Sequence, residues 1–223
     1  MKVNTNNNTN KTNTRGGDRA YVNFVQMREG SNLAGYATVV VNGIRMRGIQ
    51  IRVRDDGNTY IMFPAAKRVD KQGNPAKDQE GREIYDPYYN PSTKELRDYI
   101  EALIDAEGCR QAGDTIPPVP EGYTPTGRDN AYVRTVEQNP DSNLFGYADV
   151  YYKDVRFKGV RLRVSKAGEL YPGFQGEKRT NPDGTDAQDD RGFTIWDDWA
   201  CPVTREDRAA IMALIEAEVA KIL

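Results

Sequence analysis

The stretch GYATVVVNGIRMRGIQIRVRDDGNTYIMFPAAKR, residues 35–68, decides the fold of this chain. Residues 35–41 are rich in β-branched side chains, and Asn42-Gly43 then supplies two residues that readily take the positive φ angles of a type I′ turn. Apolar alternation resumes at Ile44. The pattern predicts a tight antiparallel hairpin whose second strand begins at Ile44.

This second strand changes the phase of its apolar alternation. Apolar side chains fall at positions 44 and 46 and then at 49, 51 and 53, so the alternation slips by one residue near Gly48. A slip of this kind predicts a β-bulge. One face of the strand is then apolar, and the opposite face is cationic. A further strand, residues 59–63, ends at Pro64 and leads into a basic loop at Lys67-Arg68.

The chain contains this pattern twice. Residues 20–107 align without a gap with residues 131–218, and roughly 36 of about 88 aligned positions are identical. The second copy repeats the phase slip at Gly159. The sequence therefore divides into four parts: an Asn/Thr-rich, disordered tail (1–19), a first repeat (20–107), a Pro/Gly-rich linker without helix or strand (108–130) and a second repeat (131–223).

Each copy closes with a predicted helix. Ser92-x-x-Glu95 and Thr204-x-x-Asp207 are similar to capping boxes, and apolar residues follow both at helical spacing. The predicted fold class is therefore α+β, with two tandem copies of a small antiparallel β-meander followed by a helix.

The cationic strand face and the basic loop recur at equivalent positions in both copies. Two equivalent basic patches suit an extended phosphate backbone. The alternative is a solvated or salt-bridged sheet surface, because acidic residues are plentiful nearby. The candidate nucleic-acid-binding residues are Arg52, Arg54, Lys67, Arg68, Arg161, Arg163, Lys178 and Arg179.

Aromatic residues are dense after each basic loop, in residues 84–89 (IYDPYY) and 195–199 (IWDDW). Exposed aromatic rings next to basic residues can stack on the bases of single-stranded RNA or DNA. The same rings can instead pack in the core or between the copies. The sequence leaves both interpretations open.

The segment YIMFPAAKR, residues 60–68, followed by IYDPYYNPSTKELRDYI, residues 84–100, resembles the SpoVG (stage V sporulation protein G) family of small bacterial regulators. The family is associated with DNA and RNA binding and usually works as a homodimer of single-domain chains. The resemblance implies that the two copies pack as an intramolecular pseudo-dimer. The second copy departs from the motif, with Pro172-Gly173 in place of Ile61-Met62, which predicts a shorter or irregular strand there.

Composition bears on the other function classes. The chain has no histidine and no phosphate-binding Gly-rich motif, so we expect neither an enzyme nor a cofactor or metal. The weak catalytic alternative is an acid/base pair among the repeated carboxylates Asp78 and Asp189, and Asp86 and Asp197. No apolar run is long enough to span a membrane, which indicates a cytoplasmic protein. A net charge of −2 and a pI near 5.4 suit a second alternative, a protein-interaction module such as a mobile genetic element carries.

Overall fold

The α+β class is confirmed by the computed structural model, which describes residues 17–136 and 142–222. The predicted tail lies outside these ranges except for its last residues, because Arg19 already begins a strand. The first copy contains β1 Arg19–Phe24, β2 Leu33–Val41, β3 Ile44–Val53, β4 Thr59–Met62, β5 Ala65–Lys67, β6 Tyr85–Pro87, β7 Tyr89–Pro91 and α1 Lys94–Ala112. The second contains β8 Asn130–Thr135, β9 Leu144–Tyr152, β10 Val155–Val164, β11 Leu170–Gly173, β12 Gly176–Lys178, β13 Trp196–Asp198, β14 Ala200–Pro202 and α2 Arg205–Val219.

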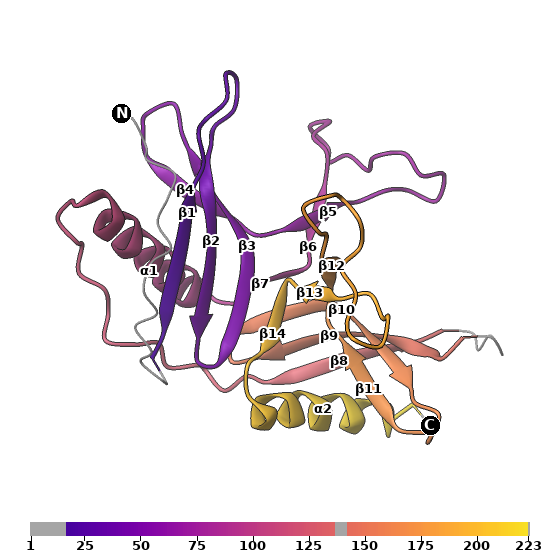
Figure 1. Ribbon diagram of the computed structural model, residues 1–223. Coiled ribbons are helices and arrows are strands. Elements are labelled where there is room, and N and C mark those ends of the chain that lie inside the picture. Colours follow the sequence, from indigo (N-terminus) through magenta and orange to yellow (C-terminus); the bar gives the residue numbers. More distant parts are fainter. Residues whose placement is uncertain (1–16, 137–141, 223) are drawn as a thin grey trace.

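Two antiparallel sheets form the body of the molecule, and each contains a strand from the other copy (Figure 1). The first sheet has the order β1-β2-β3-β14, with β4 also paired to β3. The second has the order β11-β10-β9-β8, with β7 also paired to β10. Helix α1 packs against β1 and β2, and α2 packs against β8 and β9. The two copies therefore complete each other's sheets.

The predicted hairpin and both bulges are present. Asn42 and Gly43 have φ angles of 49° and 79°, as a type I′ turn requires. The register between β2 and β3 shifts next to Gly48, and the register between β9 and β10 shifts next to Gly159. Both glycines have positive φ.

Each bulge marks the point where a long strand changes its outer partner. Before the bulge, residues 44–46 of β3 pair with β14 of the second copy; after it, residues 50–53 pair with β4 of the first. Strand β10 does the same, with β7 before its bulge and β11 after it. A bulge bends its strand and increases the local twist, so the two halves of the strand can face different neighbours.

Aromatic side chains occupy the seam between the copies. The rings of Tyr88 and Trp199, which are equivalent positions of the repeat, stack on each other with centroids 5.9 Å apart and an interplanar angle of 2°. Tyr89 is buried, and its hydroxyl donates a 2.6 Å hydrogen bond to the carbonyl of Arg47. Burying these rings adds apolar contact area at the junction of the two sheets.

One hydrophobic core runs through both copies. It includes the apolar faces of β3 and β10 on either side of their bulges and the predicted helix positions Leu96, Ile100, Ile211 and Ile215, all fully buried. Neither helix in the described ranges has the length and apolarity that crossing a membrane requires.

Three details differ from the sequence-based expectations. The predicted linker is helical at its start, because α1 continues to Ala112 and ends where Gly113 adopts a left-handed φ of 78°. The first helix is capped by Thr93, one residue after the predicted Ser92. Strand β11 has the same length as β4 despite Pro172, because it lies at a sheet edge, where a missing backbone N–H is tolerated.

We expect Gly48→Ala to lower the free energy of unfolding by about 3 kcal/mol, because alanine at positive φ costs about 1 to 2 kcal/mol and overpacking adds a similar amount. A Cβ at position 48 would lie 2.6 Å from the ring of Trp199. Gly57→Ala is the matched control, since Gly57 also has positive φ but faces open space, and it should cost only about 1 kcal/mol. Urea unfolding measures the free energy of unfolding of both variants. An equal decrease in the two would show that the close approach of Trp199 to position 48 adds nothing to the cost of the substitution.

Candidate nucleic-acid interface

The eight candidate cations occupy two kinds of site. Arg52, Arg161 and Arg163 lie on the long strands after the bulge, and Arg54 follows in the turn after β3. The other four lie on or next to two short ribbons, β5–β6 and β12–β13, rather than in loops as the sequence suggested. They are Lys67, Arg68, Lys178 and Arg179.

All four ribbon cations are paired with carboxylates. Lys67 contacts Glu83 at 2.8 Å, and Lys178 contacts Asp186 at 2.6 Å. Arg68 donates two hydrogen bonds to Asp86, at 2.9 and 2.5 Å. Arg179 does the same to Asp197, at 3.0 and 2.6 Å. The salt-bridged alternative therefore describes these four residues, since each already has an anionic partner.

Asp86 and Asp197 also bind a cation from the opposite copy. Lys158 of the second copy lies 2.8 Å from Asp86, and Arg47 of the first lies 3.3 Å from Asp197. The hydrogen bonds from Arg68 and Lys158 hold the pKa of Asp86 well below its usual range. The hydrogen bond from Arg179, with the charge of Arg47, lowers the pKa of Asp197. Carboxylates held ionised in this way tie the copies together and are poor general acids near neutral pH.

The strand arginines have a different environment. Among the residues that the structure describes, Arg52, Arg54, Arg161 and Arg163 have no carboxylate within ion-pair distance. Arg52 donates instead to the neutral side chains of Gln50, at 2.9 and 2.7 Å, and Asn32, at 2.8 Å. These arginines keep their full positive charge at the surface.

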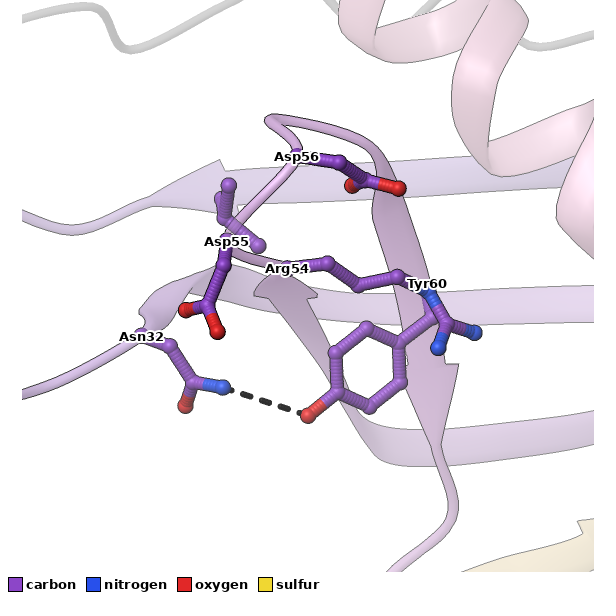
Figure 2. A pocket seen from close by; sticks show the side chains of 6 residues that line it. Asn32, Arg54, Asp55, Asp56 and Tyr60 are labelled. Carbon is purple, nitrogen blue, oxygen red and sulfur yellow. Dashed lines mark hydrogen bonds between the residues drawn. The ribbon is translucent and has the colours of Figure 1, made fainter.

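Arg54 is the least favourable of the four for an anion. Its guanidinium lies over the ring of Tyr60, 4.7 Å from the centroid, and Tyr60 accepts a 3.2 Å hydrogen bond from Asn32. Figure 2 shows these residues around a shallow depression, with the carboxylates of Asp55 and Asp56 on the same turn as Arg54. The negative charge of this turn opposes the approach of a phosphate.

Arg161 and Arg163 line a second depression, of about 380 Å³, which we call the second-copy depression. It lies where β10, β11, β13 and α2 meet, and its other lining residues are Tyr171, Pro172, Gly173, Phe174, Trp196, Asp198 and Arg208. Burial raises the pKa of Asp198, the carboxylate in this set. Three arginines and the half-exposed Trp196 therefore line one hollow.

The aromatic segments divide between packing and exposure. Tyr88, Tyr89 and Trp199 pack at the seam. Tyr85 of the first copy and its equivalent in the second, Trp196, are instead about half exposed, at 52% and 50%. The ring of Trp196 is thus available for stacking beside two of the predicted arginines.

Arg208 was not among the predicted site residues, because it lies on α2 among charges of both signs. Two departures of the second copy from the first mark the depression in the sequence: Arg161 replaces Gln50, and Gly173 replaces Met62. The first adds a cation, and the second removes a side chain.

No group of three His, Cys, Asp or Glu side chains in the described ranges could hold a metal ion. No protein-family model, curated protein or solved structure matches this chain. The resemblance to the SpoVG family rests on the quoted motifs alone.

We expect the double variant Asp86→Asn, Asp197→Asn to lower the free energy of unfolding at pH 7 by about 2 kcal/mol, since each change removes charge-assisted hydrogen bonds across the seam. Both carboxylates have a lowered pKa in the folded protein, so their contribution is full above about pH 4 and is lost as the pH falls through the folded-state values.

The measurement is urea unfolding at constant ionic strength between pH 7 and pH 3. The difference between wild type and double variant should narrow below about pH 4. Asp55→Asn, which removes a carboxylate without an ion pair, is the control and should leave stability nearly unchanged. An equal difference in free energy of unfolding between wild type and double variant at pH 7 and pH 3 would contradict the proposed role of these carboxylates.

Proposed function

We propose that this protein is a non-enzymatic nucleic-acid-binding regulator of the SpoVG type, which contacts DNA or RNA through the arginines on the outer face of its two sheets. The observation that carries this proposal is the division among the eight candidate cations. The strand arginines have no anionic partner among the described residues, whereas the ribbon cations all have one. A phosphate can therefore approach the strand arginines without displacing a carboxylate.

The position of these arginines supports the proposal further. Arg52 and Arg163 are equivalent residues, and each lies after the bulge on the long strand of its own sheet. The cations before the bulge, Arg47 and Lys158, are used instead in ion pairs between the copies. The bulge thus lies between one cation of each long strand that pairs with the opposite copy and the arginines that face outward.

The overall charge limits how such a protein binds. With a net charge of −2, the molecule has no long-range positive field, so attraction to phosphates is local. Few phosphate contacts give a modest dependence of affinity on salt compared with strongly basic proteins. We expect binding at low salt that weakens at physiological salt unless base contacts add to it.

A protein-interaction module remains the second candidate, and one feature favours it. The end of the β1–β2 hairpin exposes Phe24, Val25, Met27 and Tyr36, and the last three of these line a depression. Exposed apolar residues that cluster in this way are a common feature of protein-binding surfaces. This surface does not include any of the strand arginines, so the two functions can be tested separately.

We expect the variant with Arg52, Arg54, Arg161 and Arg163 replaced by Ala to reduce the magnitude of the slope of log K against log salt by up to about three units, at about 0.7 to 0.9 per lost phosphate contact. The matched control replaces the four ribbon cations, Lys67, Arg68, Lys178 and Arg179, and should change the slope by less than about one unit because those charges are already neutralised. Salt titrations with single-stranded and duplex probes measure both, after circular dichroism has shown that each variant is folded.

A larger effect from the ribbon variant would assign the phosphate contacts to the ribbons instead. If the wild-type protein binds neither probe at about 50 mM salt, where electrostatic attraction is strong, the nucleic-acid proposal fails and the protein-interaction function replaces it.

A further inference from the structure

The residues that line the second-copy depression differ from their equivalents in the first copy. Gly173, at its wall, corresponds to Met62, whose side chain is 44% exposed on the first sheet. The residue equivalent to Arg161 is Gln50, which accepts hydrogen bonds from Arg52 and so holds that guanidinium against the strand. In the second copy the one hydrogen bond of the corresponding Arg163 to a described residue is longer, 3.4 Å to Asn143.

The arginine near the start of each helix also has different partners in the two copies. In the first copy Arg97 donates to the carbonyl of Ile61 and pairs with Glu101 one turn later. In the second copy the equivalent Arg208 has Met212 one turn later. In both copies the guanidinium lies over the equivalent phenylalanine ring, with Arg97 5.8 Å from the centroid of Phe63 and Arg208 5.5 Å from that of Phe174. Among the described residues, Arg161, Arg163 and Arg208 have no carboxylate within ion-pair distance, and Asp198 is the one acidic residue that lines the same depression.

The chemistry of this hollow suits a nucleotide unit within a chain. Three guanidinium groups can bind phosphate oxygens, and the exposed ring of Trp196 can stack on a base. A volume of about 380 Å³ lies at the small end of the range for ligand sites, which suits one base with its phosphate. Stacking on a tryptophan requires an unpaired base, because the bases of a duplex cover each other's faces.

We propose that the second-copy depression binds a single-stranded nucleic acid, with one base stacked on Trp196 and the adjoining phosphates held by Arg161, Arg163 and Arg208. This inference rests on the proposed nucleic-acid-binding function and adds the strand form of the ligand and the place where one base stacks. The first copy completes the sheet of this site through β7.

The test uses fluorescence anisotropy with the full chain and labelled oligothymidine, oligouridine and duplex probes of about ten nucleotides or base pairs. Trp196→Ala should weaken single-strand binding by about 5- to 150-fold, the range that corresponds to the loss of one stacked base, and should leave duplex binding unchanged. Tyr85→Ala, the equivalent change in the first copy, is the matched control and should leave single-strand binding unchanged.

A second variant, Gly173→Met, fills the depression with the residue of the first copy. Gly173 does not have a left-handed φ, and a Cβ there would meet its nearest neighbour, the carbonyl oxygen of Arg161, at an ordinary 3.7 Å, so the substitution fits the backbone. It should weaken single-strand binding by about tenfold or more. Met62→Gly is its control and should not change single-strand affinity.

The proposed site is supported if the wild-type protein binds oligothymidine or oligouridine tightly and both Trp196→Ala and Gly173→Met weaken that binding. If the wild-type protein binds nucleic acid but both variants bind single strands normally, the depression is not the site and the proposed function stands. An equal loss of duplex binding in Trp196→Ala overturns base stacking. A wild-type protein that binds no probe overturns the proposed function and this inference together.

Discussion

The structure depends on the bulge that interrupts each long strand. A regular strand has one neighbour along each edge, but the bend at Gly48 and at Gly159 lets the outer edge serve two partners in succession. One partner comes from the same copy and the other from the opposite copy. The exchange of β7 and β14, the stacked Tyr88 and Trp199 and the ion pairs of Asp86 and Asp197 all lie next to this bend.

The same bend places the residues that join the two copies and the residues of the candidate nucleic-acid-binding surface on different parts of one strand. Before the bulge, the edge of the strand pairs with a strand of the opposite copy, and Arg47 and Lys158 next to the bulge form ion pairs with that copy. After the bulge, the edge belongs to a strand of the same copy, and the polar face remains at the surface with Arg52, Arg161 and Arg163. The alternating cations of one strand therefore include residues that pair with the opposite copy and residues that remain at the surface.

Local sequence signals predicted the local structure well. The positive φ of Asn42-Gly43 and the one-residue phase slip at Gly48 are properties of neighbouring residues, so the hairpin and the bulge could be predicted. The three-residue strands β7 and β14 are too short to show a period, and nothing in their sequence indicates a partner in the other copy. The charges of Lys67 and Arg68 were visible, but their neutralisation by Glu83 and Asp86 depends on how the ribbon folds. Pro172-Gly173 predicts a shorter or irregular strand, whereas in the structure both residues belong to β11 and line the depression.

Because one chain carries both copies, their association does not depend on protein concentration. A homodimer that exchanges strands loses its exchanged contacts on dilution, and its stability is inseparable from the amount of protein present. Here residues 113–129 connect the copies, and Tyr123 in this segment stacks on Tyr99 of the first copy and donates a hydrogen bond to Asp154 of the second. The tether keeps the local concentration of each partner high, so the paired sheets persist even when few molecules are present in a cell.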